Sequence, residues 1–141
     1  MAVLAHGTTL MINSISVCGV RTIDGPQEQK DIVDATDHCS GGDREYVPGL
    51  RDGGTVDLGL LVESTDSGQQ ELYLNYLSTS NELAEFVISV PGDPAVTADE
   101  FTLSFNGFVI SSGWSFPFDA LAEQSLSIKI SGAVTHSLIS A

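Results

Sequence analysis

The sequence has very few basic residues. Five Lys and Arg stand against 19 Asp and Glu, so the formal net charge at pH 7 is −14. Tight binding of a nucleic acid requires cations that replace the counterions along the phosphates. The composition therefore argues against a DNA-binding protein, although it is compatible with an acidic surface past which DNA slides. The simpler interpretation is that the acidic surface keeps the protein soluble.

Cysteine is also scarce, and the residues that build metal or catalytic sites are scattered. Cys18 and Cys39 are too few for a disulfide framework, and we expect both to be free thiols. The sequence has no CxxC or HxxxH spacing, which argues against a zinc site. His38 and Cys39 are adjacent, but neighbouring residues on a strand point to opposite faces. We therefore expect no catalytic residue, no metal and no cofactor, and thus no enzyme.

One acidic cluster leaves an alternative open. Asp34, Asp37, Asp43 and Glu45 crowd a glycine-containing turn and are the residue types that bind calcium. Their spacing does not match an EF-hand loop, which carries ligands at alternate positions around one glycine. The sequence alone does not decide whether a calcium ion binds in residues 34–45.

Long apolar runs are absent as well. No stretch approaches the roughly 20 apolar residues that a membrane-spanning helix requires, so we expect no stable membrane association. Residues 1–6 lack the basic and apolar regions of a signal peptide. We therefore expect a soluble protein that stays in the cytoplasm where it is made. With 141 residues, 42% of them hydrophobic, residues 1–141 are long enough to form a single domain.

What the sequence does contain is the alternation typical of β-strands. In residues 55–63, Val56, Leu58 and Leu60 share one face, while Asp57 and Glu63 share the polar face. Similar short stretches, bounded by turn-forming residues, occur at 11–20, 30–36, 83–91, 101–110 and 126–131. The sequence therefore predicts a mainly β protein, an antiparallel β-sandwich or barrel.

One segment has helical spacing instead. Leu72, Tyr73, Tyr76 and Leu77 recur at intervals that place them on one side of a helix. Asp66 or the serine after it is a suitable N-cap, because its side-chain oxygen can accept a hydrogen bond from a free amide of the first turn. The pattern predicts one flanking α-helix over about residues 67–78.

Residues 40–54 are predicted to form a long loop, because they contain five glycines and one proline. The segment is longer than an ordinary hairpin turn, which has about 2 to 5 residues. It also carries Tyr46, Val47 and Leu50, which a solvated loop does not need, between Arg44 and Arg51. Such a loop either docks on another surface or folds back onto its own domain.

The order of these segments resembles the major tail-tube proteins of siphophages, the long-tailed bacteriophages. The similarity centres on residues 32–37 (IVDATD) and 44–58 (REYVPGLRDGGTVDL). It continues in family order with residues 69–72 (QQEL), 86–92 (FVISVPG) and 126–132 (LSIKISG), so it covers nearly the whole chain. Residues 105–118 are more aromatic than the family pattern.

The resemblance implies a structural protein of the virion tail. Members are expected to form six-membered rings that stack into a hollow tube around a tape-measure protein, between a tail-tip or initiator complex and a tail terminator. Genomic DNA later passes through the lumen without specific binding. For this chain we expect residues 40–54 to reach a neighbouring subunit or ring, with an interface of Arg44, Tyr46, Val47, Leu50 and Arg51. Asp57 and Glu63 are candidate lumen-facing acids.

A monomeric binding module is the alternative function. The aromatic residues Phe108, Trp114, Phe116 and Phe118 are of the type that stacks on sugars or contacts a protein partner. The simpler interpretation is that they belong to the core or to a subunit interface. Self-assembly separates the two functions, because a binding module stays monomeric.

Overall fold

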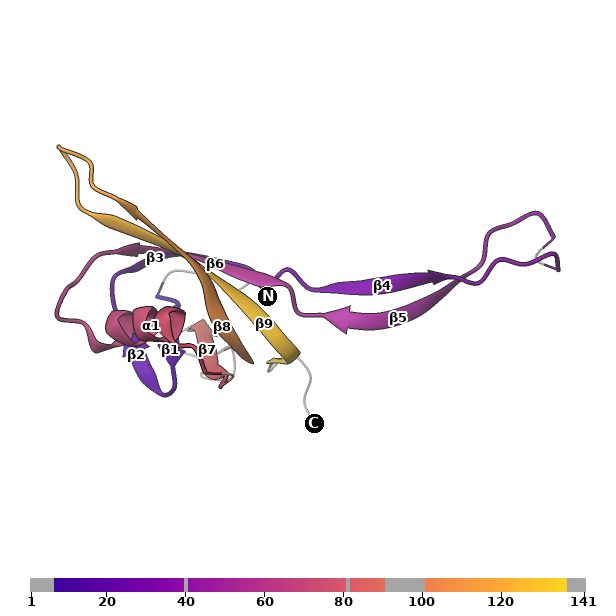
Figure 1. Cartoon of the computed structure of the whole chain (residues 1–141), viewed down its shortest axis with the longest axis horizontal. Coiled ribbons are helices and arrows are strands. Elements are labelled where there is room, and N and C mark those ends of the chain that lie inside the picture. The colour runs from indigo at the N-terminus through magenta and orange to yellow at the C-terminus, as the bar shows by residue number, and fades with distance from the viewer. Residues whose placement is uncertain (1–6, 40, 81, 91–100, 137–141) are drawn as a thin grey trace, which may run out of the picture.

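Strands dominate the computed structural model of this chain, which describes residues 7–39, 41–80, 82–90 and 101–136 (Figure 1). The strands of the larger sheet are β1 (Thr9–Ile12), β2 (Ile15–Val17), β3 (Val20–Asp24), β6 (Thr55–Leu61), β7 (Ala84–Val90), β8 (Phe101–Ser115) and β9 (Glu123–His136). A second sheet consists of β4 (Gln29–Asp34) and β5 (Tyr46–Asp52), and the helix is α1 (Ser67–Leu77).

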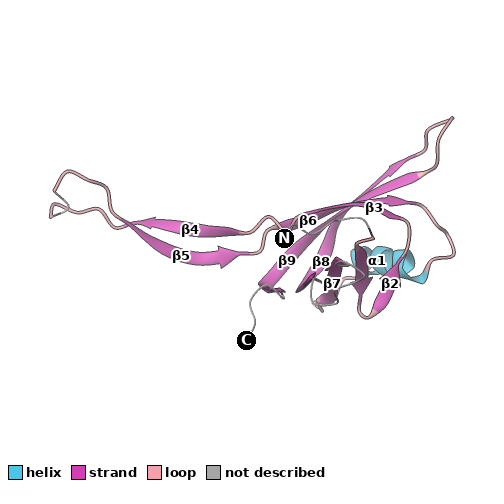
Figure 2. Ribbon diagram, turned by 180° about the vertical axis from the view of Figure 1, so that it is seen from behind, coloured by secondary structure: helices cyan, strands magenta, loops and turns pink. Residues whose placement is uncertain are grey.

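The larger sheet is antiparallel, with the strand order β2-β1-β7-β8-β9-β6-β3. It curls into a half-barrel, and α1 lies against β8, β2 and β1 (Figure 2). The prediction of a mainly β fold with one flanking helix is confirmed. In the part of the chain that the structure describes, no helix combines the length and apolarity needed to cross a bilayer.

Alternating residues of the strands form the core, as predicted for residues 55–61. Val56 and Leu58 of β6 lie opposite Ile128 and Leu126 of β9, and all four side chains are buried. In this region β6 and β9 therefore each have one buried apolar face and one solvent-facing face. The buried apolar residues are Leu10, Ile12, Val17, Val56, Leu58, Leu60, Leu72, Ala84, Phe86, Ile88, Phe105, Val109, Leu126, Ile128 and Ile130.

The helix begins where the sequence predicts. Asp66 is the N-cap, and its Oδ2 accepts hydrogen bonds from the backbone N–H of Gln69 (2.9 Å) and of Cys18 (3.1 Å). The buried side chain of Gln69 donates from Nε2 to the carbonyl oxygens of Cys18 (2.7 Å) and Leu61 (2.8 Å). Its Oε1 accepts from the N–H of Glu63 (3.0 Å). One amide thus joins α1 to the turn before β3 and to the end of β6.

Two sequence predictions of element boundaries are wrong. Residues 11–20 do not form one strand, because Asn13 and Ser14 adopt positive φ values of 49° and 69° and form the tight turn between β1 and β2. Asparagine tolerates this left-handed conformation better than most residues do. The edge strand β3 that follows was not predicted, since its alternation is short and mostly polar.

Residues 40–54 are not an irregular loop. Their second half forms β5, which pairs in antiparallel register with β4, and the connection between the two strands spans residues 35–45. The glycines obscured this strand in the sequence. Gly49 faces Asp31 across the pair, where an added Cβ would approach the Cβ of Asp31 to 3.0 Å. The small residue permits this close approach of the two chains.

Candidate functional site

A projecting hairpin is the most distinctive feature of the molecule. We call residues 29–52 the arm: β4, β5 and the segment that connects them (Figure 1). The arm extends away from the half-barrel, and β5 contacts the sheet at β9. A two-stranded hairpin with no further layer is at best marginally stable in water. The arm therefore presents surfaces that its own domain does not cover.

The uncovered surface of the arm is apolar on both faces. Val33 lies opposite Val47, and Ile32 lies opposite Pro48, so these two pairs point to opposite sides of the hairpin. Ile32 and Leu50 are 73% and 81% exposed. Exposed apolar side chains that lie together on one element mark a binding surface.

All five residues predicted as an interface lie on the arm. Tyr46, Val47, Leu50 and Arg51 belong to β5, and Arg44 precedes it. Each of them is exposed, so the structure brings the predicted set together on one projecting element. The apolar residues of β4, Ile32 and Val33, were missed, although their β-branched side chains in an otherwise polar strand were a usable signal.

Polar contacts fix the base of the arm. Lys129 of β9 forms an ion pair with Asp52 (3.2 Å), whose Oδ1 also accepts the N–H of Gly54 (2.9 Å). The hydrogen bond from the Gly54 N–H lowers the pKa of Asp52 below its ordinary value, and the contact with Lys129 is the second cause of this lowering. The N–H of Ile130 donates to the carbonyl of Gly54 (3.0 Å). These contacts hold the chain where β5 leaves the arm for β6.

At the far end of the arm, acidic side chains bind the backbone and do not converge. Asp34 accepts the N–H of Thr36 (2.9 Å), and the hydroxyl and N–H hydrogen bonds of Thr36 lower the Asp34 pKa. The N–H of Glu45 donates to Oγ1 of Thr36 (2.8 Å). Among the described residues, the three Cys or acidic side chains close enough to share a metal are Cys18, Glu63 and Asp66, outside this segment. The acids of residues 34–45 therefore form no such group here.

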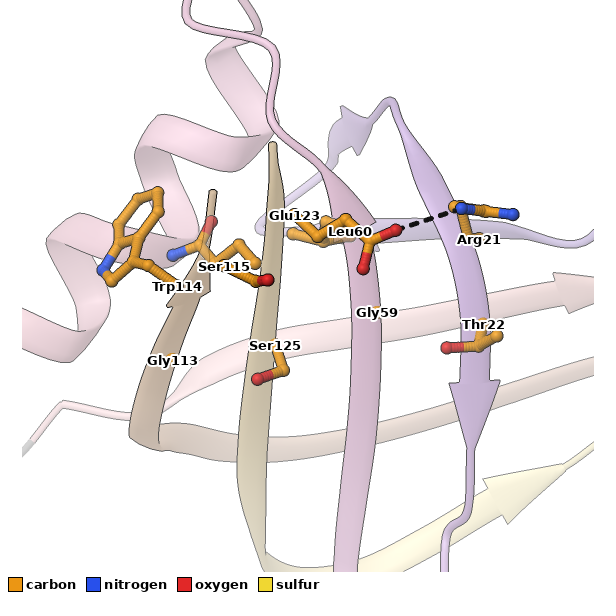
Figure 3. Close-up of a pocket in the computed structure, with 10 residues that line it drawn as sticks. Arg21, Thr22, Gly59, Leu60, Gly113, Trp114, Ser115, Glu123 and Ser125 are labelled. Carbon is orange, nitrogen blue, oxygen red and sulfur yellow. Dashed lines mark hydrogen bonds and ion pairs between the residues drawn. The ribbon is translucent and has the colours of Figure 1, made fainter. Parts of the chain in front are cut away.

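The solvent-facing side of the larger sheet is a polar face. Register places Thr22, Gly59, Ser125 and Gly113 in one row across β3, β6, β9 and β8. Figure 3 shows this row lining a groove of about 400 Å³, with Arg21 paired to Glu123 (3.2 Å) at its margin. Gly59 and Gly113 have no side chain to fill the groove, and the remaining residues of the row offer hydroxyl groups.

The two predicted lumen acids are not brought together. Asp57 lies on the polar face, directly opposite Asp24 of β3, and its Oδ1 accepts the hydroxyl of Ser127 (2.7 Å). Like charges opposite one another destabilise a strand pair. Glu63 instead follows the end of β6 and lies beside Cys18 and Asp66.

Aromatic side chains form a second exposed apolar surface. We call Tyr76, Tyr73, Trp114 and Phe116 the aromatic ladder, because successive ring centroids are 6.0, 5.9 and 6.2 Å apart. Two rungs come from α1 and two from β8 and the loop after it, and Figure 3 shows the Trp114 ring beside the helix. Phe108 lies elsewhere, opposite Lys129 on the polar face, so the four aromatics suggested by the sequence do not form one platform.

Known proteins resemble this chain in both sequence and fold. Residues 1–138 match the family described as "Phage tail tube, TTP, lambda-like". No curated protein sequence matches the chain. Among solved structures, the SPP1 tail tube gives a TM-score of 0.70 at 12% identity, covering 96% of this chain and 78% of that one.

Two further structures have the same fold. The sheath/tube terminator of the PVC extracellular contractile injection system gives a TM-score of 0.77 at 16% identity, and the alignment covers 97% of both chains. A chain of the native gene transfer agent virion gives 0.68 at 18% identity, covering 91% of this chain and 95% of that one. The structures show the fold, and the family match shows the rest: the chain belongs to the lambda-like phage tail tube family and is a structural protein of the virion tail.

Proposed function

We propose that copies of this chain, each a single domain of residues 1–141, form six-membered rings that stack into the hollow tail tube. The observation that carries this proposal is the arm, an uncovered two-stranded element with apolar residues on both faces in a member of a tail tube family. Such an element gains stability when a neighbour supplies the missing layer. Family membership favours this function over a monomeric binding module.

The edges of the larger sheet suggest how a ring closes. Strands β2 and β3 are the two outer strands, and each has one side without a pairing strand in the sheet. Edge strands present free N–H and C=O groups that pair readily with another chain. Head-to-tail pairing of one edge with the other, repeated by rotation, gives a ring in which the sheets form a continuous wall.

We assign the arm to contacts with a neighbouring subunit or ring. Tyr46, Val47 and Leu50 are the anchors, because they are exposed and apolar. Arg44 and Arg51 would pair with acids across the contact. In the described residues, the recorded ion pairs are Arg21 with Glu123 and Lys129 with Asp52, so neither arginine is paired within its own chain.

We assign the polar face to the lumen. It lies on the side of the sheet away from the core. It is lined by hydroxyls, glycines and the opposed acids Asp24 and Asp57, together with Lys129 and Phe108. Like charges on the wall repel phosphates, so DNA would pass without binding. The cross-strand pair of acids costs stability, which is consistent with a role in the lumen. Glu63 lies beyond the last residue of β6, and its assignment to the lumen is weaker than that of Asp57.

The same proposal covers the partners and the site of assembly. The related structures include a tube-terminating cap and a baseplate of the anti-feeding prophage. By analogy, this chain would meet a terminator at one end of the tube and a tail-tip or initiator complex at the other. A tape-measure protein would occupy the lumen before DNA passes through during genome ejection. We assign assembly to the host cytoplasm, and the role is structural and not enzymatic.

Placing a negative charge on an apolar residue of the arm tests the proposal. Val47→Asp and Leu50→Asp replace exposed apolar residues, so the monomer is expected to fold with an unchanged circular dichroism spectrum. Neither variant should form tubes that pellet in an ultracentrifuge. Leu83→Asp is the matched control, because Leu83 is an exposed apolar residue outside the arm, and it should pellet as the unchanged chain does. Normal tubes from both arm variants would contradict the role of the arm.

A further inference from the structure

We propose that the aromatic ladder is the surface on which the arm of a second copy docks, so that successive copies join head to tail. This inference rests on the tube proposed above and adds the receptor surface that the arm requires. It follows from the exposure and placement of the two surfaces.

The rings of the ladder contact one another and are exposed. Tyr73 contacts both Tyr76 and Trp114, and Phe116 stacks on Trp114 with an interplanar angle of 8°. Phe116 is 73% exposed, and in the loop that follows it Phe118 is fully exposed. Rings held against each other have already lost much of their rotational freedom, so docking on them costs little ordering entropy. Large aromatic residues of this type dominate the binding energy of protein interfaces.

The arm and the ladder lie at opposite ends of the molecule. The arm extends to one side of the half-barrel, while the loop between β8 and β9 and helix α1 lie on the other side, in both views (Figures 1 and 2). A copy therefore cannot cover its own ladder with its own arm. Two different surfaces that complement each other at opposite ends make a heterologous contact, and such a contact repeats into a polymer.

Individual basic residues of the arm can pair with acids beside the ladder. Three of the five basic residues, Lys30, Arg44 and Arg51, lie on the arm, and the other two are the ion-paired Arg21 and Lys129. Around the ladder, the charged residue of α1 is Glu71, and that of residues 116–122 is Asp119. The arm also carries six acids and is net negative overall, so only its three basic residues can pair with Glu71 and Asp119 across the contact.

The single tryptophan reports on this contact. Trp114 is the only Trp of the chain, so its emission describes the ladder alone. The Val47→Asp variant retains the ladder, whereas Trp114→Ser retains the arm and has no tryptophan of its own. Mixing the two variants leaves one productive contact, between the arm of Trp114→Ser and the ladder of Val47→Asp. A Trp114→Ser/Phe116→Ser chain lacks two rings of the ladder, and comparing it with Trp114→Ser shows whether loss of Trp114 alone prevents docking.

The expected result is a shift of Trp114 emission to shorter wavelength and weaker quenching by acrylamide when Trp114→Ser is added to Val47→Asp. Adding a Trp114→Ser/Val47→Asp double variant, which lacks both surfaces, should change nothing. The inference is overturned if the unchanged chain forms tubes in which Trp114 stays as quenchable as in the monomer, and the proposed tube then still stands. If the unchanged chain forms no polymer even with the tail-tip complex and the tape-measure protein present, and the mixture gives no spectral change, the tube and the inference fail together.

Discussion

Gln69 is predicted to hold the helix against the sheet through its side-chain amide. Replacing it with Met keeps the length and helix propensity of the residue but removes three hydrogen bonds, to the backbone of Cys18, Leu61 and Glu63. A hydrogen bond contributes about 1 kcal/mol net, so the free energy of unfolding should fall by about 3 kcal/mol. With a urea dependence of about 2 kcal/mol/M, the unfolding midpoint should fall by about 1.5 M.

The neighbouring glutamine supplies the control for this substitution. Gln70 is exposed, and its Nε2 donates one hydrogen bond, to the carbonyl of Ser64 (3.0 Å). Gln70→Met should therefore change the unfolding free energy by less than about 1 kcal/mol. Both variants can be unfolded in urea and followed by far-UV circular dichroism. Equal midpoints for Gln69→Met and Gln70→Met would refute the role assigned to the buried amide.

Three further predictions concern other contacts. Gly68→Ala should lower the free energy of unfolding, measured in urea, by about 1–3 kcal/mol. The reason is that the new Cβ would overlap the Ser16 carbonyl and approach Cα of Val17 to 2.6 Å. A loss of unfolding free energy no larger than that of Ser67→Ala would contradict this prediction. Asp52→Ala should speed hydrogen exchange at the Gly54 amide, because it removes the carboxylate that accepts this N–H. In the unchanged chain, the protection of the Gly54 amide from exchange should hold above the ordinary Asp pKa and disappear as the pH falls through the lowered pKa of Asp52. Unchanged exchange in the variant would count against this role of Asp52. In a Cys39→Ser background, Asp66→Asn should speed alkylation of Cys18 at pH 8, since hydrogen bonding to Asp66 raises the pKa of that thiol; equal rates would exclude this cause.

Much of the fold could be predicted from the sequence because most strands carry local patterns. The alternation of residues 55–61 and the Asp66 cap of α1 are both set by neighbouring residues, and the structure has them as expected. Strand β5 could not be recognised in this way. Its connection to its partner β4, residues 35–45, is longer than an ordinary hairpin turn, and Gly49 and Pro48 are residues that normally argue against a strand.

The candidate surfaces were predictable to different degrees. Tyr46, Val47 and Leu50 stood out in the sequence as apolar residues among glycines, and the structure exposes all three on the arm. Asp57 and Glu63 lie an even number of positions apart and would face the same side of a continuous strand. However, β6 ends at Leu61, so the alternation no longer fixes the direction of Glu63. The aromatic ladder joins Tyr73 of α1 to Trp114 of β8, and only the packing of the helix on the sheet reveals that contact.

Electron microscopy of the purified chain over a concentration series, repeated with the tail-tip complex and the tape-measure protein, tests the central claim most directly. We expect hollow tubes with sixfold symmetry, in which the arm of each subunit contacts a neighbour. Monomers under every condition, including those with both partners present, would contradict it.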